Sequence, residues 1–229
     1  QVFVAEGHKL VGDLLGHFPC KLLIATSNWL KMNHSATANE IIEVTQEELS
    51  RASLQKTPQE VLAVFVQPSY DLNPEVIKSS LCLALDDVQD PGNLGTIIRL
   101  ADWFGIEHIF CSAGTADVYN PKTVQATMGA LARVKVHYCS LPQLIESLAD
   151  IPVYGTFLSG NIIYAESLSA HGLIVMGNEG KGVSLEVEKL INNKLYIPNY
   201  PQERETSESL NVAIATAVVC SEFRRRLLP

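Results

Sequence analysis

Short apolar segments of strand type alternate with segments of helix type along the whole chain. This alternation is typical of α/β folds, in which helices pack on the faces of a mainly parallel sheet. The run LCLALDD at residues 81–87 is apolar at successive positions, as strands inside a parallel sheet are. We therefore predict an α/β fold.

A polar stretch with two prolines, PSYDLNPEVIKSS, separates two series of such segments. We predict a small N-terminal α/β domain over residues 1–67, a linker over 68–80 and a larger domain over 81–229. The larger domain contains five or six strands expected to be parallel. Ligands of such sheets bind at the carboxyl ends of the strands, so the loops that follow the strands are candidate sites.

The composition excludes several classes of protein. Apolar residues make up 47% and charged residues 18% of the 229 residues, which disfavours disorder. No run approaches the roughly 18 apolar residues that span a bilayer, and no secretory leader is recognisable. The net charge of -8 disfavours a protein that coats nucleic acid without specificity, but it allows a local basic site such as Arg224 to Arg226. That arginine run is also typical of a solvated helix end.

The five cysteines are widely spaced and form neither a CxxC pair nor a His/Cys cluster. We expect reduced thiols in the core of a cytoplasmic protein, no metal site and no membrane association. Because the first residue is Gln1 rather than methionine, a natural N-terminal segment is expected to precede it.

The first candidate loop is DDVQDPGNLGTIIRLADWFG at residues 86–105. Asn93 is predicted to cap a helix from Leu94 to about Phe104, and Gly95 to let another backbone come close. Arg99 is expected within the first two turns, near the loop. A capped helix with one surface arginine would give the same pattern.

The second candidate loop, VMGNEGKGVS at residues 175–184, places three glycines around Glu179. The glycine spacing fits neither a dinucleotide-binding turn nor a phosphate-binding P-loop, which also disfavours a nucleotide-dependent oxidoreductase. A glycine-rich turn with one carboxylate suits a neutral or cationic ligand held by backbone groups. An ordinary turn that requires positive φ remains the alternative.

The third candidate loop lies within residues 195–226. Ser209 and Asn211 are predicted to open a long apolar helix that ends at about Arg226. Unpaired backbone N-H groups at such a helix start favour ligands, although helix capping alone would also explain these residues.

Together and in this order, the loops resemble a known family. Residues 93–99 (NLGTIIR), 174–182 (IVMGNEGKG) and 196–213 (YIPNYPQERETSESLNVA) resemble the three motifs of the SpoU or TrmH branch of the SPOUT RNA methyltransferases. FVAEGHKLV, at residues 3–11, resembles the start of the ribosomal-protein-like substrate-binding domain often attached to this branch. The third motif departs from the family: Asn199 replaces the usual methionine, a following glycine is absent, and the loop is longer.

The resemblance implies a deep trefoil knot in a parallel sheet, S-adenosylmethionine bound in a bent form, and a homodimer with sites near its interface. It also implies methylation of a ribose 2′-hydroxyl in rRNA or tRNA. A catalytically silent RNA-binding protein on the same scaffold is the alternative, against which the intact Arg99 and the SLN sequence at 209–211 argue.

The resemblance also assigns residues. Arg99 belongs to the reacting centre, either as a base or as the group that orients the hydroxyl; the guanidinium normally stays protonated, which favours orientation. Side chains in place of the glycines are expected to collide with the cofactor. The supporting catalytic residues are Asn93, Glu179, Ser209 and Asn211. The cofactor-binding residues are Thr156, Leu158, Gly177, Asn178, Glu179, Gly182, Ile197 and Leu210.

Overall fold

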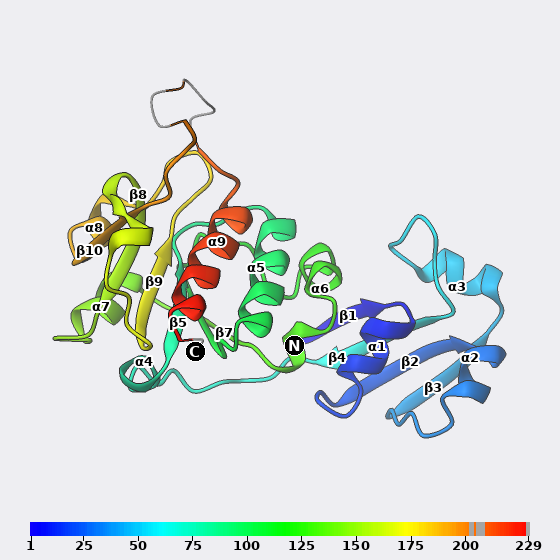
Figure 1. Ribbon diagram of the computed structural model, residues 1–229. Coiled ribbons are helices and arrows are strands. Elements are labelled where there is room, and N and C mark those ends of the chain that lie inside the picture. The colour runs from blue at the N-terminus through cyan, green and yellow to red at the C-terminus, as the bar shows by residue number, and fades with distance from the viewer. Residues whose placement is uncertain (202–203, 205–208, 228–229) are drawn as a thin grey trace.

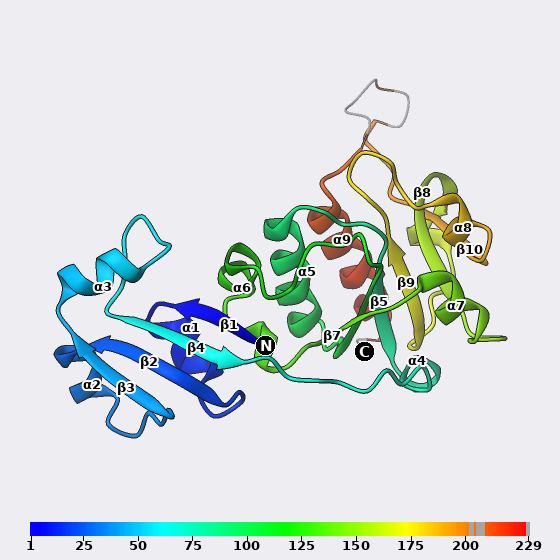
Figure 2. The same ribbon diagram turned by 180° about the vertical axis from the view of Figure 1, so that it is seen from behind.

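The computed structural model describes residues 1–201, 204 and 209–227 (Figure 1). Two α/β units follow one another along the chain, and each has its own sheet. The N-terminal unit, coloured blue to cyan, lies at one end of the molecule beside α6 of the second unit (Figures 1 and 2). The predicted fold class is confirmed.

The N-terminal unit has a mixed sheet of four strands in the order β1-β4-β2-β3. Only β2 and β3 run parallel; β4 is antiparallel to both of its neighbours. Its strands are β1 (Val2–Glu6), β2 (Cys20–Thr26), β3 (Glu40–Val44) and β4 (Val61–Val66). Its helices are α1 (His8–Leu14), α2 (Ser27–Met32) and α3 (Gln46–Ala52).

The C-terminal unit has a parallel sheet of six strands in the order β10-β8-β9-β5-β6-β7. Its strands are β5 (Leu81–Leu85), β6 (His108–Cys111), β7 (Lys135–Tyr138), β8 (Val153–Ile162), β9 (Gly172–Met176) and β10 (Asn193–Tyr196). Its helices are α4 (Val76–Ser79), α5 (Pro91–Trp103), α6 (Pro121–Thr127), α7 (Leu141–Glu146), α8 (Leu185–Glu188) and α9 (Val212–Arg225), with 3-10 turns at Ala130–Ala132 and Ile163–Ala165.

The central position of β5 in the sheet explains why its sequence is apolar. Leu81, Leu83 and Leu85 point into the core formed with α5 and α9, whereas Cys82 and Ala84 point into the core formed with α4, α7 and α8. Side chains alternate between the two faces of a strand, and here both faces are covered by helices. The run is therefore apolar at every position.

The two units share a packed contact. The ring of Phe3 on β1 stacks on Tyr119, with centroids 5.1 Å apart, and Gln55 donates a hydrogen bond of 2.9 Å to Gln125 on α6. The stretch 68–80 contains α4, whose Ile77 is buried in the core of the second unit. The domain limits 1–67, 68–80 and 81–229 stay a prediction.

Two helices begin at other residues than predicted. Helix α5 begins at Pro91 and is capped by Asp90, whose carboxylate accepts the backbone N-H of Asn93 at 2.8 Å. Asn93 is therefore not the cap, because proline is well suited to the first helical position and moves the start upstream. Helix α9 begins at Val212, so Asn211 is its cap and Ser209 lies before it.

Gly95 has the predicted role. A Cβ atom at this position would lie 2.5 Å from the Cβ of Ala126 and 2.6 Å from the carbonyl oxygen of Thr123. Helices α5 and α6 can approach this closely only because residue 95 lacks a side chain.

All five cysteines, which lie within the described residues, are free thiols, and four of them are buried. Burial raises the pKa of Cys82 to about 11 and that of Cys220 to about 12. Both thiols are therefore protonated at neutral pH and serve as apolar core groups, as predicted.

No helix within the described ranges is long and apolar enough to cross a membrane. The segment that would close the expected trefoil knot includes residues 202–203 and 205–208, which lie outside the described residues. The knot stays a prediction.

A buried histidine, His137, makes stability depend on pH. His137 on β7 stacks on Phe110, and its Nε2 lies 3.1 Å from Nδ1 of His108. Burial, followed by the charges of His108 and Lys135, lowers the pKa of His137 to about 4. Because the unfolded chain binds this proton from about pH 6.5 downward, the native state loses stability as the pH falls from about 6.5 to 4.

We expect this loss to reach up to about 3 kcal/mol, and His137→Gln to make the pH dependence shallower in that window. Urea unfolding of both proteins between about pH 4 and 7 measures it. Equal pH slopes for the two proteins would assign the dependence to other groups.

Candidate active site

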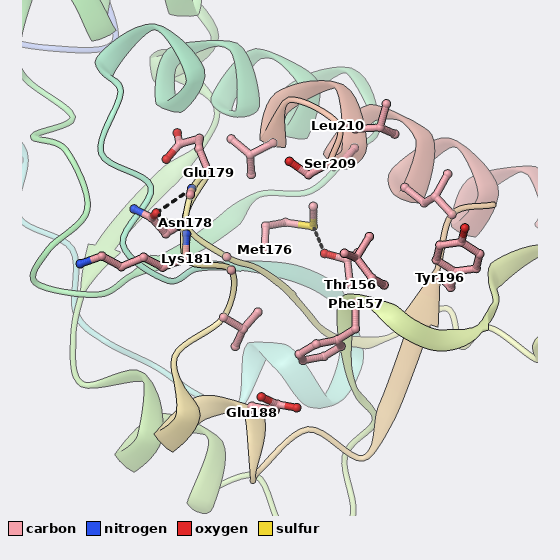
Figure 3. Close-up of a pocket in the computed structure, with 18 of the residues that line it drawn as sticks. Thr156, Phe157, Met176, Asn178, Glu179, Lys181, Glu188, Tyr196, Ser209 and Leu210 are labelled. Atoms are coloured by element: carbon pink, nitrogen blue, oxygen red, sulfur yellow. Dashed lines mark hydrogen bonds between the residues drawn. The ribbon is translucent and has the colours of Figure 1, made fainter. Parts of the chain in front are cut away.

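The second and third candidate loops, together with part of β8, line one cavity of about 530 Å³ (Figure 3). It lies at the carboxyl ends of β9 and β10, beside the middle of β8. Its walls come from residues 156–159, 176–183, 188, 196–197, 209–210, 212 and 215. The volume falls in the range of small-molecule and cofactor sites.

Residues 177–183 form a tight loop that is closed by its own hydrogen bonds. The backbones of Asn178 and Gly182 bond each other in both directions at 2.9 Å. The Oδ1 atom of Asn178 also accepts the N-H groups of Gly180 and Lys181, at 2.9 and 3.0 Å. Asn178 thus stabilises the loop, because its side chain hydrogen-bonds backbone groups of the protein.

The glycines of this loop have different roles. A Cβ atom at Gly177 would lie 2.3 Å from the carbonyl carbon of Gly182 and 2.4 Å from the nitrogen of Val183. Gly182 has a φ of +71°, where other residues are strained, and a Cβ atom at Gly180 would make only an ordinary contact of 3.7 Å with Oδ1 of Asn178. The crowding at Gly177 comes from the loop itself. The expected collision between side chains at these glycines and the cofactor stays a prediction.

Two aspartates that the sequence analysis did not single out hold this loop. Asp86 is 5% exposed, and its carboxylate accepts the backbone N-H of Ser184 at 2.7 Å. The carbonyl oxygen of Asp87 accepts Nδ2 of Asn178 at 2.7 Å. Their position in the sequence directly after β5, the strand that pairs with β9, could have identified these aspartates as part of the site.

A chain of side-chain hydrogen bonds joins the three loops. The Nδ2 atom of Asn211 donates to Oδ1 of Asn93 at 3.0 Å, and Nδ2 of Asn93 donates to Oε1 of Glu179 at 3.0 Å. The Oδ1 atom of Asn211 caps α9 by accepting from Ala213 and Ile214. Each amide therefore has one orientation, and the chain ends on the carboxylate of Glu179.

All eight predicted cofactor residues line the cavity. They are Thr156, Leu158, Gly177, Asn178, Glu179, Gly182, Ile197 and Leu210, and Ser209 lies with them. Figure 3 shows Ser209 and Leu210 on one side of the cavity and Thr156 on the other, where the Thr156 hydroxyl contacts the Met176 sulfur at 3.9 Å. The lining residues that were not predicted include Phe157, Met176, Lys181, Glu188 and Tyr196.

Arg99 lies elsewhere than predicted. It is the ninth residue of α5, so it falls in the third turn and not in the first two. Its side chain is exposed, does not line the cavity, and has no hydrogen-bond or ion-pair partner among the described residues. The earlier start of α5 at Pro91 accounts for the difference.

Charged side chains of both signs line the cavity: Glu179 and Lys181 come from the loop after β9, and Glu188 comes from α8 on another side (Figure 3). Glu188 is paired with Lys194, whose Nζ lies 2.5 Å from Oε1 of Glu188 and 4.7 Å from the centre of the Phe157 ring. Glu179 accepts only the neutral amide of Asn93 among the described residues. Such a cavity suits a ligand with an apolar body and a positive charge.

The sequence profile of the SpoU rRNA methylase family matches residues 80–221, which is more than half of the chain. The chain belongs to the SpoU rRNA methylase family. The profile of the MRM3-like substrate binding domain matches residues 1–63. The predicted family and its reaction, S-adenosylmethionine-dependent 2′-O-methylation of RNA, are confirmed.

Relatives of this family match nearly the whole chain. The 23S rRNA (guanosine(2553)-2′-O)-methyltransferase RlmP of Bacillus subtilis is 34% identical over 98% of this chain and 89% of its own length. A structure of a TrmH-family protein from Porphyromonas gingivalis is 44% identical, with a TM-score of 0.88, and covers 99% of this chain and 90% of its own. An AdoMet-bound rRNA methyltransferase from Sinorhizobium meliloti is 30% identical, with a TM-score of 0.84, and covers 100% of this chain and 88% of its own.

Proposed function

We propose that this chain methylates the ribose 2′-hydroxyl of a guanosine in 23S rRNA. The hydrogen-bonded chain from Asn211 through Asn93 to Glu179 carries the proposal, because it joins the three family motifs to one another and ends on Glu179, which lines the cavity. The substrate is proposed from the similarity to RlmP of Bacillus subtilis. The N-terminal unit, which matches a substrate-binding domain, is proposed to bind the RNA.

The cavity fits S-adenosylmethionine, which when bound supplies a methyl group on a positively charged sulfur. Ile197, Leu210 and Leu158 offer apolar walls for an adenosyl group. Glu179 places a carboxylate on the same cavity, which favours positive charge. Asn93 fixes the position of this carboxylate and thereby orders the loop around the donor.

Arg99 is proposed to act on the RNA. A guanidinium stays protonated, so Arg99 binds a phosphate and orients the neighbouring hydroxyl, while positioning supplies much of the rate. Its exposure leaves its donors available to the substrate. Ser209 and Asn211 are proposed to support the centre from the start of α9.

We propose that the chain acts as a homodimer through the apolar side of α9 near the cavity. Ile214 is 55% exposed and Leu210 is 51% exposed, although both lie beside the proposed centre. A second copy that covers this side would bury them. Isologous contacts of this kind are the commonest in homo-oligomers.

We expect Ile214→Asp to convert the dimer to a monomer, because the interface would bury an unpaired carboxylate. Sedimentation equilibrium measures the molecular mass, and Leu54→Asp, at a 68% exposed position of the N-terminal unit, is the control. A monomeric wild-type protein at micromolar concentration would contradict the dimer.

The function is tested with the purified chain, S-adenosylmethionine and deproteinised 23S rRNA from a strain that lacks the protein. We expect one methylated ribose, mapped on a guanosine, and cofactor binding by calorimetry. Cofactor binding without transfer to any RNA would support the silent RNA-binding alternative. The cytoplasmic location stays a prediction, which fractionation of the source cells would check.

A further inference from the structure

One aromatic side chain stands out on the surface of the catalytic unit. Trp103, at the end of α5, is 83% exposed, whereas Trp29, the other tryptophan, is 1% exposed. Single exposed apolar side chains are common and carry no meaning alone. The surroundings of Trp103 distinguish it.

Arginines bind the chain on both sides of Trp103. Arg133 donates two hydrogen bonds of 2.8 Å to the carboxylate of Asp102. Arg224 donates to the carbonyl oxygens of Phe104 and Gly105, at 2.7 and 3.0 Å. The backbone that carries the indole is therefore held by guanidinium groups that bond the residues before and after Trp103.

The arginines of α9 add to this charge. Arg225 and Arg226 both pair with the nearly buried Glu222, so two cations share one carboxylate. The carboxyl-terminal ends of α5 and α9 lie side by side in both views (Figures 1 and 2). The arginine run thus lies at helix ends, which was the alternative interpretation of Arg224 to Arg226 in the sequence. It also leaves a local excess of positive charge, although the net charge of the chain is -8.

Arg99 belongs to the same face. It precedes Trp103 by four residues, and side chains at this spacing lie one above the other on a helix. Both are exposed. If an RNA strand binds Arg99 through one phosphate, a neighbouring nucleotide of that strand therefore lies beside Trp103.

We propose that Trp103 is a stacking platform for an unpaired base of the RNA substrate, with the flanking arginines binding its phosphates. We name this surface the Trp103 face and define it by Arg99, Trp103, Arg133 and Arg224. Exposed aromatic rings among cations are the usual means of binding unpaired nucleotides. A symmetric contact centred on this face would bring its cations against the same cations of a second copy, which disfavours a subunit interface there. The inference rests on the proposed function, because its occupant is the RNA.

Intrinsic fluorescence tests this contact directly. We expect the wild-type emission to be of the exposed type and to be quenched by a mixed-sequence single-stranded oligoribonucleotide and by deproteinised 23S rRNA. The quenching should weaken as salt is added. Trp103→Phe should lose the quenching, because the remaining Trp29 is buried.

Kinetics give a second measurement. Trp103→Ala should raise the KM for rRNA roughly tenfold, with calorimetric affinity for S-adenosylmethionine unchanged. Trp103→Phe, which keeps a smaller ring, should raise it less. Leu72→Ala, another exposed apolar position, is the control and should leave the KM unchanged.

Methyl transfer by the wild type without quenching of Trp103 would overturn this inference alone. An emission that shifts to shorter wavelength with protein concentration, without RNA, would also overturn it and would assign the face to a second copy. If RNA were neither bound nor methylated, the proposed function would fail together with it.

Discussion

Arg99→Ala is expected to lower the rate of methyl transfer at saturating RNA by about 100-fold or more, with cofactor affinity within a few fold of wild type. The residue does not line the cavity, so its loss leaves the cofactor walls intact. It does remove the proposed cation that holds the phosphate beside the reacting hydroxyl. Single-turnover kinetics and calorimetry separate the two effects.

Arg51→Ala is the matched control for Arg99→Ala. Arg51 is also an exposed helical arginine, but it lies on α3 of the N-terminal unit and pairs with Glu47. Its replacement should leave the saturated rate unchanged, even if RNA binding weakens. Normal turnover by the Arg99 variant would remove Arg99 from the centre, and a parallel loss of cofactor binding would reassign it to the cavity.

Gly177→Val is expected to weaken S-adenosylmethionine binding roughly ten- to hundredfold. The new Cβ would lie within 2.4 Å of backbone atoms of Gly182 and Val183, and backbone cannot move away as a flexible side chain can. The loop must open, and opening breaks the paired hydrogen bonds between Asn178 and Gly182. Calorimetry measures the loss.

Gly180→Ala is the control in the same loop. Its Cβ would meet only Oδ1 of Asn178, at an ordinary 3.7 Å, so cofactor affinity should stay within a few fold. Equal losses for the two variants would show that the loop tolerates no side chain at any glycine. Unchanged affinity of Gly177→Val would contradict the rigid loop.

Local pattern was sufficient for much of the fold. Apolar runs predicted the strands, and β5 (Leu81–Leu85) lies within the predicted run at residues 81–87. The starts of α5 and α9 were less predictable, because Asp90, Asn93, Ser209 and Asn211 are all good capping residues. Which of them caps depends on what the others bind in the folded chain, and Asn93 is held by Glu179 and Asn211.

The sequence by itself determined the α/β class and the family, because these depend on local periodicity and on ordered motifs, and it named part of the cavity lining. Only the tertiary structure decided which of these residues contact one another. Asn93 bonds residues 86 and 118 positions away, Gly177 is crowded by its own loop, and Arg99 lies on the open side of α5 with Trp103. Spacing along a chain cannot specify such contacts, since they arise only when separate strands place their loops at one edge of the sheet.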